Sequence, residues 1–369
     1  MDVTVGGFDV PAMIDSIRRL VTVESPTADI ESCSTVVSAA HEVCGRWLAA
    51  PARIEEHRGR PVLRWGPAEP DVLLLGHLDT VWPLGTIDRL PWGDDGSRLT
   101  GPGVFDMKAG VVQAFAALAA LGLTPEDGVG ILLTTDEETG SHDSRAVIAD
   151  AITRARAVLV FEPSLDGALK TQRKGTSWYR AHLTGRAAHA GLDPERGVNA
   201  LLSAASLATA TLAWGDAPAG TTVTPTVLVA GTTANTVPAQ ATLTIDVRAW
   251  TASEQRRVDD SVRAWTPALG TVEVAGGIDR PAMEASASAR LYELANDCAR
   301  ELGIPPLAQA AVGGASDGNL TAAAGVATLD GLGAVGDGAH AEHEWASIQD
   351  LAPRAALAAA LVRRLLDDK

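Results

Sequence analysis

The chain has 369 residues, 46% of them hydrophobic, and a formal net charge of −16 at pH 7. This length is large for one hydrophobic core, so we expect a globular protein of two domains. No basic stretch offsets the acidity, which argues against a nucleic-acid partner, and no apolar run reaches the ~20 residues that span a bilayer, which argues against a membrane partner.

The N-terminus and the cysteines bear on the compartment in which the chain works. The first eleven residues lack the basic start and the apolar run of a signal peptide, so we expect a cytoplasmic location. Cys33, Cys44 and Cys298 are far apart and form no CxxC pair. They predict neither a disulfide framework nor a thiolate zinc site, and a buried structural role is the simplest interpretation.

Helices and buried strands alternate along the first 167 residues. Helices are predicted at 14–20, 32–48 and 109–121, and short, continuously apolar runs stand at 71–76, 129–135 and 157–161. Such runs are typical of strands that are covered on both faces. The alternation predicts an α/β domain with a mixed, mostly parallel sheet and helices on both faces.

From about residue 170 the pattern changes. Strands are predicted at 178–183, 222–229, 242–248 and 271–274, and helices at 197–214 and 252–265. The order β-α-β-β-α-β is that of a ferredoxin-like α+β sandwich. Because a helix at 286–302, further α/β segments and a closing helix at 351–366 follow, we expect a small domain, 168–280, inserted between two parts of a larger one, 1–167 and 281–369.

Potential metal ligands follow the predicted strands of the larger domain. His77 comes directly after one strand, where open α/β sheets gather ligands, and Asp79 points to the same side and can accept the second imidazole N–H. Taken alone, this His-Leu-Asp sequence is weak evidence for a metal site, because a lone histidine is more often an ordinary core or surface residue. Asp106 lies in a glycine-rich segment, and glycines let the backbone bend sharply enough to bring the carboxylate close to an ion. The alternative is a plain turn that is capped by Asp106.

Further acids stand at the ends of two other strands. Asp136, Glu137 and Glu138 follow the strand at 129–135, and a helix cap explains one of these three carboxylates. Glu162 follows the strand at 157–161.

A second imidazole comes from GDGAHAEHEW (336–345), where His340 and His343 compete as ligands and spacing does not decide between them. Two imidazoles and three carboxylates suffice for two divalent ions and leave Glu137 to move protons, which indicates hydrolysis by a metal-activated water.

Five motifs together resemble the M20 metallopeptidases, most closely their glutamate carboxypeptidase (carboxypeptidase G2-like) branch. The motifs are GHLDTV (76–81), GVFDMKAG (103–110), TDEETGS (135–141), FEP (161–163) and GRAAHAG (185–191). They occur in the family's order, and the likeness as a whole runs from about residue 70 to residue 350. The family pattern of His followed four residues later by Glu and an aromatic residue matches His340, Glu344 and Trp345, and on this ground the resemblance selects His340 over His343.

The resemblance implies a centre of two Zn²⁺ ions per subunit, and Co²⁺ or Mn²⁺ also suit such N/O ligands. His77 and Glu162 would hold one ion, Glu138 and His340 the other, and Asp106 would bridge them, with a cis peptide bond after Asp106. Asp79 would orient His77, and Glu137 would be the general base and acid.

The resemblance also assigns the inserted domain as a lid that forms a homodimer. His189 would reach into the partner's active site and stabilise the oxyanion. Asn235, Arg248 and Arg280 would bind a substrate carboxylate, and Gly314, in GGASD (313–317), would line the substrate pocket. The alternatives are a turn residue for Asn235, a surface strand residue for Arg248 and a plain loop for the glycines.

The function expected from all this is hydrolysis of the amide bond of a small-molecule or short-peptide substrate, either an N-acyl amino acid or a peptide with a free C-terminal carboxylate. The alternatives are an N-acyl amino acid deacylase or dipeptidase of the same family, and a non-catalytic binding protein that kept the fold. A nucleotide-binding α/β protein is disfavoured because none of the strands predicted at 71–76, 129–135 and 157–161 is followed by GxGxxG, and no GxxxxGK[ST] occurs.

Overall fold

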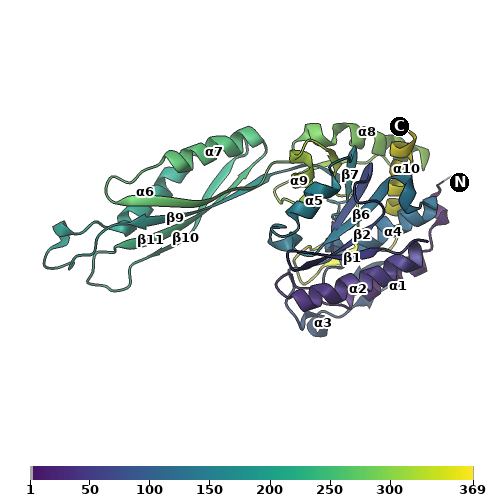
Figure 1. Ribbon diagram of the computed structural model, residues 1–369, viewed down its shortest axis with the longest axis horizontal. Helices are drawn as coiled ribbons and strands as arrows, with labels where there is room; N and C mark the ends of the chain where they lie inside the picture. Colours follow the sequence, from purple (N-terminus) through teal and green to yellow (C-terminus); the bar gives the residue numbers. More distant parts are fainter. Residues whose placement is uncertain (1–2, 369) are drawn as a thin grey trace. The chain divides into compact units, whose positions relative to one another are not determined.

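The computed structural model describes residues 3–368, which divide into two compact units (Figure 1). The larger unit takes in the chain up to Gln172, Ala285–Val312 and the residues from Ser316 onward. The inserted unit consists of Arg173–Glu284 and Gly313–Ala315. The insertion expected at 168–280 therefore begins and ends a few residues later by its contacts, and a short piece of the later chain joins it.

The larger unit is built on a mixed, mostly parallel sheet, which confirms the predicted fold class. Its strands lie in the order β1-β2-β6-β3-β7-β14. The pairs β6–β3, β3–β7 and β7–β14 are parallel, whereas β1–β2 and β2–β6 are antiparallel. The strands are β1 Arg53–His57, β2 Arg60–Trp65, β3 Val72–His77, β6 Val129–Thr134, β7 Ala157–Val160 and β14 Ala327–Leu329.

Helices cover both faces of this sheet because both sets of alternating strand residues are apolar. In β3, Val72 and Leu74 pack into a core with α1, α2, α4, α8 and α10, while Leu73 and Leu75 pack on the other side with α5 and α9. The helices are α1 Val10–Val21, α2 Ile30–Trp47, α3 Thr86–Arg89, α4 Ala109–Leu121, α5 Arg145–Ala151, α8 Ala285–Glu301, α9 Asp317–Ala323 and α10 Leu351–Asp367. The three cysteines are free and buried.

One segment of the described chain, Val104–Leu121, is long and apolar enough to cross a membrane, but 78% of it is buried inside the protein. It includes α4, which packs against α10 and α1 in the core. Its apolar composition is therefore that of a core helix.

Two smaller sheets complete the larger unit, and neither was predicted. One has the order β15-β16-β5-β4, in which Trp345 pairs with Thr100. It joins two segments that are far apart in the sequence. Its strands are β4 Gly93–Asp94, β5 Arg98–Thr100, β15 Gly336–Asp337 and β16 Trp345–Ser347, and the other small sheet pairs β8 Leu169–Arg173 with β13 Gln309–Val312.

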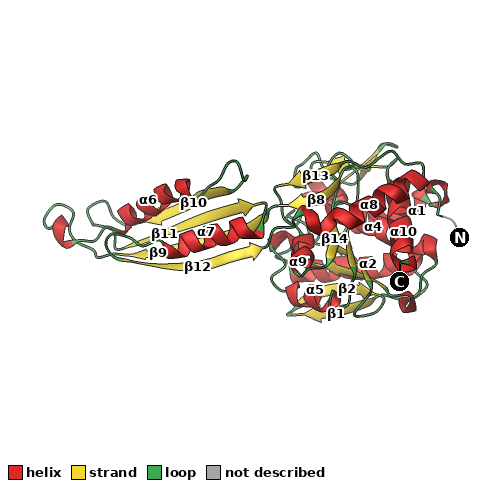
Figure 2. Cartoon of the chain, turned by 90° about the horizontal axis from the view of Figure 1, so that it is seen from above, coloured by secondary structure: helices red, strands yellow, loops and turns green. Residues whose placement is uncertain are grey.

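The inserted unit has the predicted ferredoxin-like arrangement. Its antiparallel strands lie in the order β10-β11-β9-β12, and α6 and α7 cover one face of the sheet (Figure 2). Along β9, Tyr179, Ala181 and Leu183 face these helices, while the residues between them are exposed. Its elements are β9 Gly175–Thr184, α6 Ala200–Ala210, β10 Thr222–Ala230, β11 Gln240–Ala249, α7 Ala252–Ala264 and β12 Thr271–Arg280.

Candidate metal centre

Three neighbouring parallel strands of the larger unit end at one edge of the sheet, and each delivers a candidate ligand there. His77 is the last residue of β3 and pairs in register with Thr134, the last residue of β6. The turn after β6 carries Glu138, and Glu162 follows β7 two residues beyond its end. Parallel pairing aligns these strand ends, so three segments separated in sequence meet at one place.

The two histidines face opposite oxygens of the Asp106 carboxylate. His77 Nε2 lies 3.3 Å from Asp106 Oδ1 and 3.5 Å from Glu162 Oε1. His340 Nε2 lies 3.3 Å from Asp106 Oδ2 and 3.1 Å from Glu138 Oε2. The structure therefore brings all five predicted ligands together, with Asp106 in the middle. The Asp106–Met107 peptide bond is cis, as the resemblance implied.

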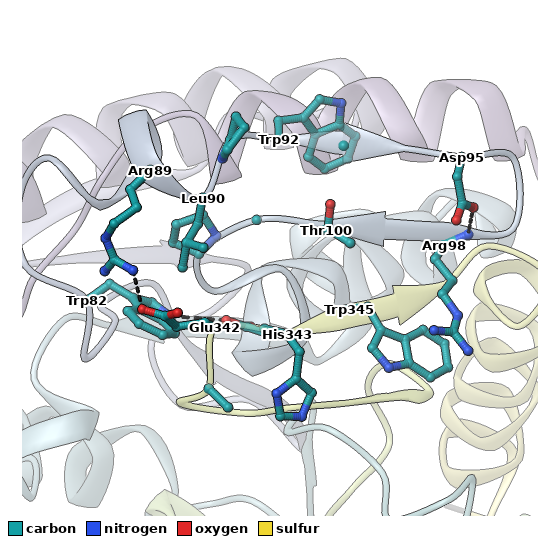
Figure 3. A pocket seen from close by; sticks show the side chains of 16 residues that line it. Trp82, Arg89, Leu90, Trp92, Asp95, Arg98, Thr100, Glu342, His343 and Trp345 are labelled. Carbon is teal, nitrogen blue, oxygen red and sulfur yellow. Dashed lines mark hydrogen bonds and ion pairs between the residues drawn. The ribbon is translucent and has the colours of Figure 1, made fainter.

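His343, the competing ligand, does not share this cluster. It is exposed and lines a neighbouring pocket of about 560 Å³ together with Trp82, Trp92 and Trp345 (Figure 3).

Several candidate ligand atoms in the cluster are buried and have no hydrogen-bond partner. Among residues 3–368, His77 Nε2, Asp106 Oδ1 and Glu138 Oε1 belong to this class. Buried polar atoms normally form hydrogen bonds, so three unpaired ligand atoms in one place indicate a site for a cation. Imidazole and carboxylate ligands suit Zn²⁺, Co²⁺ or Mn²⁺, so the residues fit the cations that the sequence predicted.

A main-chain carbonyl just after β3 sets the tautomer of the neutral His77 ring. Its Nδ1 lies 3.0 Å from the main-chain oxygen of Asp79, and a carbonyl can only accept a hydrogen bond. Nδ1 therefore carries the proton in the neutral ring, and Nε2 presents its lone pair toward Asp106 and Glu162. We expected the Asp79 carboxylate to take this role, but its nearer oxygen is 3.5 Å from Nδ1.

The Asp79 carboxylate holds the turn that carries Glu137 and Glu138. It accepts hydrogen bonds from the main-chain N–H groups of these two residues, at 3.3 and 3.2 Å, and from the Thr27 hydroxyl at 2.7 Å. Thr27 lies in the loop between α1 and α2, where no sequence signal marked it. The side chain of Asp136, which precedes this turn, accepts from the amides of Asp143 and Ser144 just before α5.

Glu137 lies beside the cluster and is buried. Donor atoms of His77, Glu137 and Glu162 all lie within 4.8 Å of one another. The side chain of Glu137 is thus within reach of a group bound between His77 and Glu162, and it is shielded from bulk water.

The imidazoles and carboxylates of the cluster shift one another's pKa values. Burial would lower the pKa of His77, but Asp106, Asp79 and Glu162 outweigh it and raise that pKa well above its usual value. Asp106 and Glu138 raise the pKa of His340 to about 10, and burial raises the pKa of Glu138 to about 7. Burial also opposes ionisation of Asp106, yet His340 and His77 together hold its pKa below the ordinary range.

The remaining predicted site residues lie in the inserted unit and form two groups. His189 is exposed, and the main-chain oxygen of Asn235 accepts a hydrogen bond from the neighbouring Ala190 at 2.9 Å. At the other end of the sheet, Arg248 and Arg280 both pair in register with Thr176 of β9. Between Thr176 and Thr184, which precedes the His189 loop, β9 rises roughly 26 Å at about 3.3 Å per residue.

The structure therefore does not bring His189 together with the two arginines of its own chain. Arg248 forms an ion pair with Asp246 at 3.0 Å on the same strand, and the Arg280 main-chain oxygen accepts from Gln255. The Gly314 oxygen accepts from Arg173 at 3.2 Å.

Comparison with known proteins identifies similar chains and folds. The model of Peptidase family M20/M25/M40 matches residues 73–364, a range that contains every candidate residue above. Carboxypeptidase G2 of Pseudomonas sp. strain RS-16 is 30% identical over 252 residues, 63% of this chain, and a probable carboxypeptidase of Aspergillus clavatus is 34% identical over 198 residues, 47% of this chain. The chain spans only about half the length of these curated relatives, 58% and 43% respectively.

Solved structures share the fold over nearly the whole chain. Aminopeptidase PepT from Bacillus cereus superposes with a TM-score of 0.74 at 20% identity and covers 97% of this chain and 99% of its own. The M20 family metallo-carboxypeptidase Sso-CP2 from Sulfolobus solfataricus gives a TM-score of 0.73 at 15% identity, covering 96% and 99%.

Proposed function

This chain belongs to peptidase family M20/M25/M40, and from that premise we propose that it is a di-metal hydrolase that cleaves an amide bond in an N-acyl amino acid or a short peptide with a free C-terminal carboxylate. The observation that carries the proposal is the position of Asp106, which offers one carboxylate oxygen to each of two imidazoles at 3.3 Å. A carboxylate shared in this way suits a pair of cations.

The chain's own residues divide between the two cations. His77 and Glu162 would hold one, His340 and Glu138 the other, and Asp106 would contact both. When bound, such ions supply Lewis acidity that polarises the scissile carbonyl and lowers the pKa of a water molecule toward about 7. His340 is 50% exposed while His77 is 1% exposed, so a substrate would approach from the His340 side of the cluster.

Glu137 would move the protons. Its side chain lies next to His77 and Glu162, and Asp79 fixes its turn through the Glu137 and Glu138 amides. From this position it would take a proton from the attacking water and deliver it to the leaving amine.

The inserted unit would bind the substrate. Arg248, Arg280 and Asn235 would bind the free carboxylate, since a guanidinium matches a carboxylate in a two-bond geometry, and Gly314 would line the pocket. His189 would donate to the oxyanion of a second copy's active site in a homodimer. The separation of His189 from the two arginines along β9 supports this assignment to different active sites.

Carboxypeptidase G2 and the probable carboxypeptidases among its relatives support a carboxypeptidase before a deacylase or dipeptidase. The presence of Glu137 beside a complete ligand set disfavours a non-catalytic binding protein.

The deciding experiment compares zinc-loaded wild-type protein with Glu137→Gln on a panel of acyl-glutamates, acetylated amino acids and dipeptides. We expect the variant to bind zinc normally and to lose about 10²–10⁴-fold in rate. Glu126→Gln, at an exposed position away from the cluster, is the matched control. Turnover by Glu137→Gln at the wild-type rate would remove Glu137 from the mechanism, and a wild-type protein that cleaves nothing in the panel would remove the proposed function.

A further inference from the structure

Glu344 lies at the end of the turn that carries His340, and its carboxylate receives four hydrogen bonds. Oε1 accepts from the amides of Phe105 and Asp106 at 2.9 and 3.1 Å. Oε2 accepts from the amide of Gly103 at 3.0 Å and from the Trp82 indole Nε1 at 3.1 Å. The side chain is 4% exposed. The sequence pattern marked Glu344 but gave it no role.

The three amides come from the bend that presents Asp106. Gly103 has a left-handed backbone (φ 73°), and Asp106 departs from helical geometry (φ −113°, ψ 91°) just before α4 begins at Ala109. The amides ahead of a helix have no acceptor within it. A carboxylate from another segment satisfies them here, and its negative charge is favourable beside the start of a helix.

A buried carboxylate needs such partners because removing a charge from water is costly. Beside the four hydrogen bonds, the buried ammonium of Lys108 interacts favourably with Glu344, and its Nζ donates to the main-chain oxygen of Val23 at 2.9 Å. The interaction therefore joins the Asp106 bend firmly to the Glu344 turn.

The turn itself fixes Glu344 relative to His340. The Ala341 amide donates to Gly338 O at 2.8 Å, and the Glu344 amide donates to Ala341 O at 3.0 Å. Gly338 has a φ of 81°, and a Cβ placed there would lie 2.9 Å from the Glu344 backbone. Any movement of Glu344 would therefore move His340 with it.

We propose that Glu344 is a positioning residue that sets the distance between the Asp106 carboxylate and the His340 imidazole, and through it the affinity of the centre for a divalent cation. The inference rests on the proposed metal centre but not on the proposed substrate. Glu344 touches neither the reacting atoms nor the cation, and it acts through the main chain of the residues that do.

Trp82 gives a second way to test the contact. It lines the pocket of Figure 3 and donates one of the four hydrogen bonds to Glu344. Trp82→Phe removes that donor and leaves the carboxylate with its three amide partners.

The experiment measures Co²⁺ binding to the full-length metal-free protein by calorimetry and by the visible absorption of bound Co²⁺. Glu344→Gln keeps the size of the side chain, but its NH₂ group would face amide donors that need an acceptor. We expect cation affinity to fall about 10–100-fold with a changed Co²⁺ spectrum, as when groups that orient metal ligands are removed. Trp82→Phe should reduce affinity less, by about five-fold, because one hydrogen bond is lost.

Glu342→Gln is the matched control, since Glu342 is a carboxylate on the same turn that pairs with the surface residue Arg89. It should bind Co²⁺ like the wild type. Equal losses in Glu342→Gln and Glu344→Gln would overturn the proposal, because a general loss of negative charge would then explain them. Wild-type affinity in Glu344→Gln, with only a lower melting temperature, would also overturn it, as would wild-type affinity in Trp82→Phe if Glu344→Gln fails to fold. None of these measurements needs a substrate, so their outcome does not depend on whether the hydrolase assay succeeds.

Discussion

His77, in the larger unit, is 1% exposed and faces carboxylates from three other chain segments, whereas His189, in the inserted unit, is exposed and its ring accepts a hydrogen bond from Gly191 in its own loop. The same contrast holds between Asp106, whose bend is held by Glu344, and Arg248, which pairs with its strand neighbour Asp246. The larger unit thus builds its site before any ligand arrives. Under the proposed function, the candidate groups of the inserted unit would contact a substrate or a second copy.

The largest expected effect comes from a substitution in the candidate metal centre of the larger unit. In Asp106→Asn the residue shared by both imidazoles loses its charge, so we expect cation binding to become substoichiometric. The rate should fall on the order of 10³-fold or more, since the ions supply several kcal/mol of stabilisation. Elemental analysis after dialysis measures the metal content, and a full complement of two ions in Asp106→Asn would show that Asp106 is not shared.

His189→Ala tests the proposed contribution of the inserted unit to the active site of a second copy. Loss of an oxyanion donor should lower the rate about 10²–10³-fold with cation binding unchanged. Mixing His189→Ala with Glu137→Gln after reversible dissociation should then restore about a quarter of wild-type activity. Half of randomly formed dimers are mixed, and each mixed dimer has one complete site. Mixtures as inactive as either parent would contradict the assignment of His189 to the partner's site.

The pH dependence of cation binding tests whether a cation competes with protons for the residues of the metal centre. The raised pKa values of His340, about 10, and Glu138, about 7, mean that a cation must displace their protons. Raising the pH removes those competing protons, so affinity should rise between pH 6 and pH 9 by up to about ten-fold per unit for each proton displaced. Calorimetry in buffers of different ionisation enthalpy counts the released protons. An affinity that is constant over this range would contradict the expectation.

Thr27→Val should have the smallest effect. It removes the hydroxyl that donates to Asp79 at 2.7 Å and leaves that buried carboxylate with one partner fewer. We expect the free energy of unfolding to fall by about 1–3 kcal/mol, measured by urea denaturation. Thr27→Ser keeps the hydroxyl and should retain most of the stability. Wild-type stability in Thr27→Val would show that this hydrogen bond makes no net contribution.

The parts of the candidate site that lie at strand ends could be predicted from the sequence. His77, Glu138 and Glu162 each follow a run of apolar residues, and parallel pairing necessarily brings such ends together. The choice of His340 over His343 could not be made from spacing, because the turn between β15 and β16 orients the two side chains differently. It needed the family pattern, and the distances from His340 to Asp106 and Glu138 agree with that choice.

The contacts that hold the ligands in place could not be predicted. Thr27 and Asp79 are 52 residues apart, and Glu344 and Asp106 are 238 residues apart. Neither pair has a local periodicity that would reveal the contact, because each depends on how loops meet after the sheet has formed. The small sheet β15-β16-β5-β4 was missed for the same reason, since strands of two or three residues leave no recognisable alternation.

That small sheet has a consequence for synthesis of the protein. Trp345 can pair with Thr100 only after all the residues between them have been synthesised, and the same holds for Glu344 with the Asp106 bend. Closing so long a loop carries an entropic cost before the contact repays it. A nascent chain can therefore pair β1, β2, β6, β3 and β7 before His340 and Glu344 reach the Asp106 bend. Under the proposed function, capture of the metal ions would follow that late contact.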